Sequence, residues 1–124
     1  MQRPHTRDRF ALAEPYLRQL GELVEELALR AHTRCTLEPR HFFGGAALYA
    51  DGSICASLSP AGLALKLPGD TCVELLAHGD ARPLQYFEGG RVKRGYVVLS
   101  PALREDPTAV RELFRSSFGH VADA

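Results

Sequence analysis

A cluster of basic and aromatic residues between positions 86 and 96 is the part of the sequence best suited to binding. Three cations and three rings lie within it: Arg91, Lys93, Arg94, Tyr86, Phe87 and Tyr96. Such cations bind phosphate groups, and such rings stack on nucleic-acid bases. A solvated hairpin whose rings belong to the core has the same composition, so both interpretations stay open. We take Tyr86, Arg91, Lys93 and Arg94 as the candidate interaction surface.

Histidines and cysteines are the other residues that can hold a metal or attack a substrate. His32, Cys35 and His41 lack the spacing of a zinc site, so they can bind metal only if the fold brings them together. Cys72 is the candidate nucleophile, because the first turn of a helix can lower a thiol pKa. Cys55 is expected to be a packing residue in a strand. We predict no catalytic residue, no cofactor and no metal, and therefore a protein that is not an enzyme.

A glycine pair, Gly44-Gly45, invites comparison with a phosphate-binding loop. The surrounding sequence lacks both GxGxxG and GxxxxGK[ST], and the pair precedes a predicted strand rather than a helix. Glycines in that position usually mark a bulge or a close approach of two backbones. We therefore predict a structural role for this pair.

Length, charge and composition restrict the class of protein. The chain has 124 residues, 45% of them hydrophobic, and 15 basic residues balance 15 acidic ones. One domain of this size can bury a core without disulfides or metal, and zero net charge argues against a strongly basic nucleic-acid domain, though not against a local patch. The sequence shows no secretory signal and no membrane span, and its three cysteines form no disulfide pattern. We predict a cytoplasmic protein with no membrane contact.

The elements that must position the candidate surface follow from hydrophobic periodicity. Residues 1–9 are polar and basic, and residues 1–11 are predicted to form a flexible arm. A helix is predicted from Pro15 onward, because apolar residues recur at spacings of three and four from Leu17 to Ala31. The same stripe continues back to Phe10 if the helix starts earlier and is kinked.

Residues 42–67 are predicted to form an antiparallel meander. Strands are expected at 42–49, 53–58 and 63–67, and Asp51-Gly52 predicts a tight hairpin turn between the first two. A short segment near Arg34 can add an edge strand.

The second half is predicted to hold two helices around two strands. Asp70 caps a helix over residues 71–78, with Val73, Leu76 and Ala77 facing inward and Gly79 closing it. Strands follow at 84–87 and 92–99, joined by a turn at residues 88–90. Asp106 caps a last helix, which Gly119 is expected to stop.

The predicted order is therefore α-β-β-β-α-β-β-α, in an α+β fold with two layers and a five-stranded antiparallel sheet. One domain is expected over residues 12–120, followed by a short tail at residues 121–124. An exposed sheet edge in such a fold permits a homodimer.

Four segments in register resemble the TfoX/Sxy N-terminal domain family. FFGGAALY at 42–49 with DGSICA at 51–56 resembles its MFGG-hydrophobic-DGKMFA signature, and LALKL at 63–67 resembles its LYLK strand. GDARPLQYF at 79–87 is similar to its GxxPFxYx segment, and RGYVVLSP at 94–101 to its sxxYYxVP segment. The four segments lie within residues 42–101, and the resemblance as a whole covers roughly residues 17–118.

The resemblance implies a secretion-chaperone-like fold and a non-enzymatic domain with no catalytic residues to transfer. Named family members are bacterial competence regulators that act with a transcription activator and carry a second, helical domain. This chain is expected to be a stand-alone unit. We therefore expect a regulatory module that binds an unknown protein partner and can act in transcription regulation. The alternative is a nucleic-acid-binding module that uses the basic residues 91–94 and the N-terminal arm.

Overall fold

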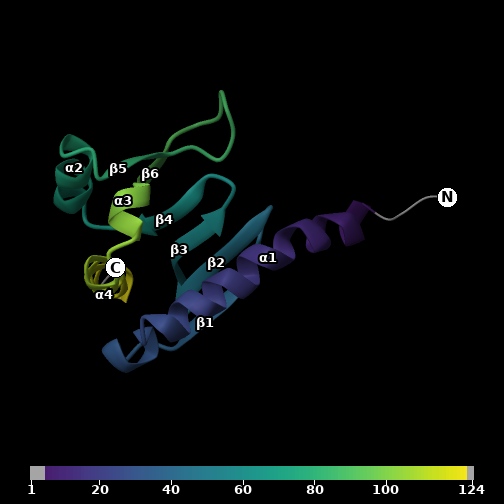
Figure 1. Ribbon diagram of the computed structural model, residues 1–124, viewed down its shortest axis with the longest axis horizontal. Coiled ribbons are helices and arrows are strands. Elements are labelled where there is room, and N and C mark those ends of the chain that lie inside the picture. Colours follow the sequence, from purple (N-terminus) through teal and green to yellow (C-terminus); the bar gives the residue numbers. More distant parts are fainter. Residues whose placement is uncertain (1–4, 123–124) are drawn as a thin grey trace.

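The computed structural model describes the backbone of residues 5–122 and the side chains of residues 14–122. Six strands form one sheet in that part of the chain, with helices packed beside it (Figure 1). The elements in chain order are α1 (His5–Glu26), η1 (Leu29–His32), β1 (Leu37–Phe42), β2 (Gly45–Ala50), β3 (Ser53–Ser59), β4 (Gly62–Lys66), α2 (Gly69–Ala77), β5 (Ala81–Leu84), β6 (Lys93–Leu99), α3 (Pro101–Arg104) and α4 (Pro107–Ala122).

The sheet is antiparallel throughout, in the spatial order β1-β2-β3-β4-β6-β5. The first four strands are consecutive hairpins. After β4 the chain passes through α2, runs along the outer edge as β5, and returns as β6 between β4 and β5. The loop that joins β5 to β6 is the long green excursion in Figure 1.

Helices cover one face of the sheet, which we call the helix-covered face. Leu20 and Val24 of α1 and Phe114 of α4 are at most 1% exposed, and they pack in one cluster with apolar side chains of β2, β3, β4 and β6. The inward side chains of α2 and α3 join the same cluster. Each helix is amphipathic, so this face removes most of the apolar stripes from water.

The predicted antiparallel α+β architecture is confirmed, but the sheet has six strands and not five. The predicted strand at 42–49 corresponds to β2, except that Phe42 ends the additional strand β1, because Phe43 adopts a left-handed conformation (φ 52°) and turns the chain between the two strands. The extra strand considered near Arg34 lies slightly later, at Leu37–Phe42. Pro39 is tolerated in it because β1 is an edge strand.

The order of elements also differs in detail, and is α-β-β-β-β-α-β-β-α-α when η1 is set aside. The additional helix, α3, begins after Ser100, whose hydroxyl accepts a hydrogen bond from the Leu103 backbone N–H at 3.1 Å. Pro101 stands at its first position, where a missing N–H costs nothing. A local cap therefore creates an element between the strand predicted at 92–99 and the last predicted helix.

The first helix starts earlier than Pro15, which lies inside α1. Of the predicted arm at 1–11, residues 5–11 belong to the α1 backbone, while residues 1–4 lie outside the described part of the chain. At the other end α4 runs to Ala122, so Gly119 does not stop it as predicted. Phe118 and Val121 are buried on either side of that glycine, and their packing holds the helix together.

Two further predictions are wrong because packing rotates or shifts an element. Val73 and Leu76 of α2 point outward, at 67% and 38% exposed, and Ala77 is also exposed; Cys72 and Leu75 face the core instead. β5 covers Ala81–Leu84 rather than residues 84–87. In β6, Gly95 has φ +84° and lies where the register with β5 shifts.

Several turn and cap predictions are confirmed. Asp51 and Gly52 both have positive φ and join β2 to β3. Asp106 accepts a hydrogen bond from the Ala109 N–H at 3.2 Å at the start of α4. A Cβ at Gly45 would collide with the Leu58 carbonyl oxygen of β3, so that glycine marks the close backbone approach that we expected.

Candidate binding cavity

The face of the sheet opposite the helices, which we call the second face, carries its own small apolar cluster. Its buried members come from β4, β5 and β6: Ala64, Leu84, Tyr96 and Val98. Ile54, Ala61 and Tyr86 pack against them. Among the described side chains, the buried apolar residues of the helices belong to the other cluster, and strand and loop residues form this one.

Tyr86 anchors the loop of residues 85–92 over the second face. Its hydroxyl lies 3.2 Å from the hydroxyl of Ser57 on β3, and Ser57 is only 1% exposed. The Tyr86 ring lies 6.3 Å from the ring centroids of both Phe42 and Phe43, within the range of aromatic contact. The loop is therefore tied both to the middle of the sheet and to the β1–β2 turn.

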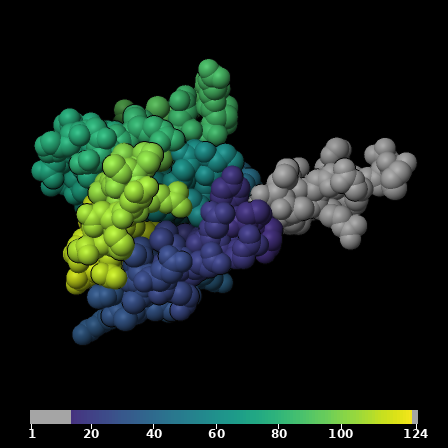
Figure 2. All heavy atoms as spheres, viewed as in Figure 1, coloured from purple at the N-terminus to yellow at the C-terminus, as the bar shows by residue number. Residues whose placement is uncertain are grey.

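The tip of this loop has a defined conformation. The Gly90 N–H donates to the Phe87 carbonyl at 2.9 Å, and the Gln85 side-chain amide donates to the Gly90 carbonyl at 2.6 Å. A Cβ at Gly90 would lie 2.8 Å from the Phe87 ring, so this ring rests directly on the glycine backbone. The loop projects above the body of the molecule, as Figure 2 shows in green.

A cavity of about 850 Å³ lies between this loop and two turns of the sheet. Ligand pockets of proteins typically have about 300–1,000 Å³. Its lining comes from the β1–β2 turn, the β3–β4 turn, and the segment from the loop into β6: Phe42, Phe43, Gly44, Ser59, Pro60, Tyr86, Phe87, Arg91, Val92, Lys93 and Arg94. Three segments far apart in the sequence therefore form one cavity.

All four residues of the predicted interaction surface line this cavity: Tyr86, Arg91, Lys93 and Arg94. The alternative in which the aromatic rings belong to the core holds for Tyr96, which is 6% exposed. It does not hold for Phe87, which is 71% exposed. The sequence reasoning missed Phe42 and Phe43. The signal was present as two adjacent aromatic residues before a glycine pair, but we assigned them to a continuous strand.

Cations and aromatic rings alternate across the second face. The Nζ atoms of Lys66 and Lys93 lie 5.9 and 6.0 Å from the Tyr96 ring centroid, and the Arg40 guanidinium lies 4.6 Å from that of Tyr49. These distances are those of cation–π contacts. Burial raises the pKa of Tyr96 to about 12, so its hydroxyl stays protonated beneath the two ammonium groups.

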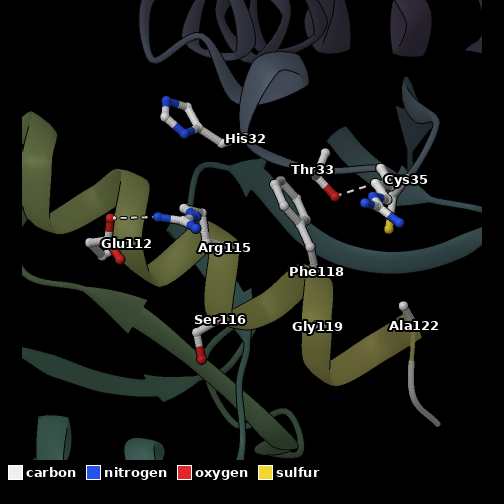
Figure 3. Close-up of a pocket in the computed structure, with 10 residues that line it drawn as sticks. His32, Thr33, Cys35, Glu112, Arg115, Ser116, Phe118, Gly119 and Ala122 are labelled. Carbon is white, nitrogen blue, oxygen red and sulfur yellow. Dashed lines mark hydrogen bonds and ion pairs between the residues drawn. The ribbon is translucent and has the colours of Figure 1, made fainter.

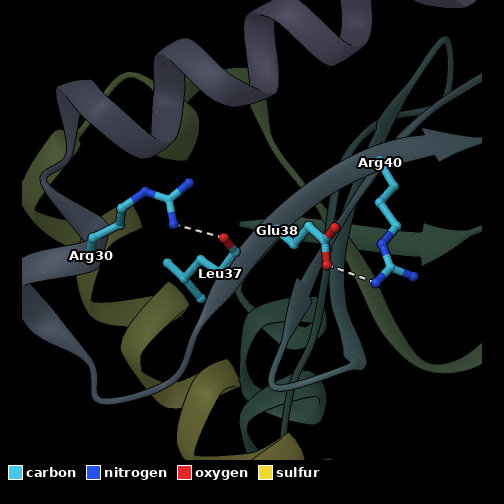
Figure 4. A network of polar contacts seen from close by, with 4 residues as sticks. All are labelled: Arg30, Leu37, Glu38 and Arg40. Carbon is cyan, nitrogen blue, oxygen red and sulfur yellow. Dashed lines mark hydrogen bonds and ion pairs between the residues drawn. The ribbon is translucent and has the colours of Figure 1, made fainter.

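Glu38 and Arg40 form an ion pair on the same face, toward the β1 edge. Arg40 Nη2 lies 2.7 Å from Glu38 Oε1 (Figure 4). This hydrogen bond lowers the pKa of Glu38 and raises that of Arg40. Beside it, Arg30 donates to the Leu37 carbonyl at 2.7 Å and ties η1 to β1. Arg40 is therefore already in an ion pair, whereas Arg91, Lys93 and Arg94 of the cavity have none with any other described side chain.

The fold does not bring His32, Cys35 and His41 together. His32 and Cys35 line a separate, open hollow of about 530 Å³ beside α4, with Glu112 and Arg115 (Figure 3). His41 lies on β1, with its Nε2 atom 3.9 Å from Glu14 of α1. No group of three or more His, Cys, Asp or Glu side chains is placed to hold a metal among the side chains that the structure describes.

The two buried cysteines have raised rather than lowered thiol pKa values. Burial raises the pKa of Cys55 to about 12 and also raises that of Cys72. Cys72 Sγ lies 3.6 Å from the Leu67 carbonyl oxygen, under α2. A raised pKa leaves little thiolate at neutral pH, so the helix N-terminus does not activate this thiol as we considered from the sequence.

No described helix has the combination of length and apolar character that crossing a membrane requires. No curated protein matches the sequence closely enough for comparison. The family model described as the TfoX N-terminal domain matches residues 25–121, which include every residue of the cavity lining. Because that match spans well over half of the 124 residues, the chain belongs to the TfoX N-terminal domain family.

Proposed function

We propose that this protein is a non-enzymatic regulatory module that binds a protein partner, and that the cavity beneath loop 85–92 is where the partner docks. The observation that carries the proposal is the gathering of exposed apolar side chains at one place. The described part of the chain has five large exposed hydrophobic side chains: Phe43, Val73, Leu76, Phe87 and Val92. Three of the five line this cavity, and clustered exposed apolar surface is characteristic of interaction sites.

The family supports the regulatory part of this proposal. The chain belongs to the TfoX N-terminal domain family, and the sequence resembles competence regulators that act with a transcription activator. We extend the proposal to transcription regulation in the cytoplasm. The three cysteines are free thiols, as expected in a reducing compartment.

The test is recovery of partners from native extract with matched variants. Wild type is compared with Arg91→Ala/Lys93→Ala/Arg94→Ala, and with Arg18→Ala/Arg104→Ala/Arg115→Ala, which removes three exposed arginines elsewhere. We expect a partner that the first variant loses and the control variant retains. Equal recovery of every partner by all three proteins would exclude the cavity rim as the docking surface.

Nucleic-acid binding is the second candidate, favoured by the exposed rings of Phe43 and Phe87 beside three cations. Aromatic side chains stack on bases, and cations follow the phosphate backbone. This candidate predicts a mobility shift with single- or double-stranded probes at about 50 mM salt, and an affinity that falls steeply as salt rises. The absence of a shift under those conditions excludes it.

A further inference from the structure

We infer that the cavity recognises an acidic segment of a partner protein, in which one bulky apolar side chain is flanked by carboxylates. This inference rests on the proposed function and adds the chemistry of the partner. Three observations lead to it. The cavity has an apolar interior, its rim carries the cations Arg91, Lys93 and Arg94 without acidic partners among the described side chains, and the apolar and basic residues line the same cavity.

The interior is suited to an apolar anchor. Phe43 and Phe87 are 77% and 71% exposed and come from separate segments, the β1–β2 turn and the tip of loop 85–92. Val92 is 55% exposed and lines the same cavity. An inserted apolar side chain would remove these surfaces from water, and buried aromatic contacts of this kind dominate the binding energy of many interfaces.

The tip of loop 85–92 is also preorganised to receive the apolar side chain of a partner. Its internal hydrogen bonds and the seat of Phe87 on Gly90 hold the ring in place before any partner binds. Preorganisation reduces the entropy lost on binding. The aromatic anchor site therefore exists in the free protein.

The rim is suited to carboxylates. Arg91, Lys93 and Arg94 form no ion pair with any side chain in the described part of the chain. Glu88 is the one acidic residue of loop 85–92. Three cations within four positions therefore create a local positive field on a protein whose net charge is zero, and that field favours an anionic partner.

Confinement favours a short acidic segment over a nucleic-acid strand. Proteins that bind single strands present a basic groove that follows the backbone for several nucleotides. Here Arg91, Lys93 and Arg94 line one cavity, whereas Lys66 lies over the Tyr96 ring and Arg40, toward the β1 edge, is already paired with Glu38. A short peptide with one apolar anchor side chain and adjacent carboxylates therefore matches the single apolar cavity and its three cations.

The test uses three fluorescein-labelled nine-residue peptides and fluorescence anisotropy. The first has a central phenylalanine with two glutamates on each side and serine elsewhere; the second replaces the glutamates with glutamines, and the third replaces the phenylalanine with alanine. We expect the first peptide to bind at least about tenfold more tightly than either control, which corresponds to the loss of one strong contact.

Protein variants assign each preference to its part of the cavity. In Arg91→Ala/Lys93→Ala/Arg94→Ala, the preference for glutamate over glutamine should disappear while the preference for phenylalanine remains. In Phe87→Ala the reverse is expected. The Arg18→Ala/Arg104→Ala/Arg115→Ala control should behave as wild type, and circular dichroism checks that each variant is folded.

Each contrary outcome overturns the inference in a distinguishable way. If the glutamate and glutamine peptides bind equally through Phe87, the charge requirement is wrong while the docking surface of the proposed function stands. Absence of binding by all three peptides refutes the inference, and the extract experiment then decides the proposed function alone. Tighter binding of oligothymidylate would identify nucleic acid as the occupant. Light scattering that shows a dimer in wild type and a monomer in Phe87→Ala would identify a second copy.

Discussion

The two faces of the sheet use their apolar residues differently. On the helix-covered face, side chains such as Phe114 and Leu48 are fully buried between strands and helices. On the second face, Tyr96 and Leu84 are buried by neighbouring strand and loop side chains, and the rings of Phe43 and Phe87 stay exposed. One face stabilises the fold, and the other leaves part of its apolar surface available for a partner.

Each face also contains a buried serine hydroxyl. The hydrogen-bond partners of the two hydroxyls differ as the two faces do, since one partner is buried and the other is partly exposed. Ser117 of α4 donates at 3.0 Å to the carbonyl of Cys55, the residue of β3 left without a counterpart where the β2–β3 register shifts. Ser57 pairs with the Tyr86 hydroxyl, which is only half-buried. The first bond lies wholly inside the protein, whereas the second reaches a loop that water can approach.

The largest effect is expected for Phe114→Ala on the helix-covered face. Removing a fully buried phenylalanine leaves a cavity, and such changes typically cost about 3–5 kcal/mol of unfolding free energy. Urea unfolding measures the change. A loss below about 1 kcal/mol, the scale of an ordinary surface substitution, would show that the helices contribute less to the core than their packing indicates.

Ser117→Ala should have the next largest effect. It leaves the buried Cys55 carbonyl without its side-chain donor, which typically costs about 1–3 kcal/mol. Ser57→Ala provides the comparison on the second face, and we expect a smaller loss because the Tyr86 hydroxyl can turn to water. Urea unfolding of both variants tests this order, and equal losses would remove the distinction between the two hydroxyls.

Phe87→Ala makes the same kind of change as Phe114→Ala, but on the second face. Because the ring is 71% exposed, we expect stability within about 0.5 kcal/mol of wild type, together with weaker peptide binding. Thermal unfolding and anisotropy on the same sample measure both. A large loss of stability would mean that Phe87 supports the fold rather than the binding site.

The smallest effect is on the free energy of unfolding at alkaline pH. At neutral pH the Cys55 thiol and the Tyr96 hydroxyl are protonated in both the folded and the unfolded chain, so they make no difference to stability there. The pKa of Cys55 rises from 9.0 to about 12 on folding, and that of Tyr96 from 10.0 to about 12, both mainly through burial. Above pH 9 the unfolded chain releases the Cys55 proton while the folded chain retains it, so stability falls with rising pH. Tyr96 adds to the decline above pH 10.

Urea unfolding between pH 8 and pH 11 follows this decline. Cys55→Ala should flatten the part that begins near pH 9, and Tyr96→Phe the part that begins near pH 10. Unchanged slopes in both variants would contradict the burial of these two groups.

Much of the fold could be predicted where a signal is local. Asp51-Gly52 consists of the residues that favour a tight turn, and Asp106 has a side chain that can cap a helix. The apolar stripe that includes Leu20 and Val24 has the period of a helix. Each depends on a few neighbouring residues. The boundary between β1 and β2, which we did not predict, depends on positive φ at Phe43, a conformation that non-glycine residues seldom take and that propensity therefore does not predict.

Only half of the candidate site could be predicted from the sequence. Arg91, Lys93 and Arg94 are close in sequence, so their common location, where loop 85–92 leads into β6, followed from their spacing. Phe42 and Phe43 are more than forty positions from Tyr86, and their contact depends on how loop 85–92 folds back over the sheet. No local pattern contains that contact.

The sequence by itself determined the antiparallel α+β class, the Asp51-Gly52 turn, the Asp106 cap and the cluster of three cations, because these depend on side chains within a few positions of one another. Tertiary structure alone decided which side of α2 faces the core, how β6 shifts its register at Gly95, and which rings meet the cations. The physical reason is that burial is a property of the whole packed chain. Val73 and Cys72 are both apolar neighbours on one helix, and only contact with the sheet determines that Cys72 is buried and Val73 exposed.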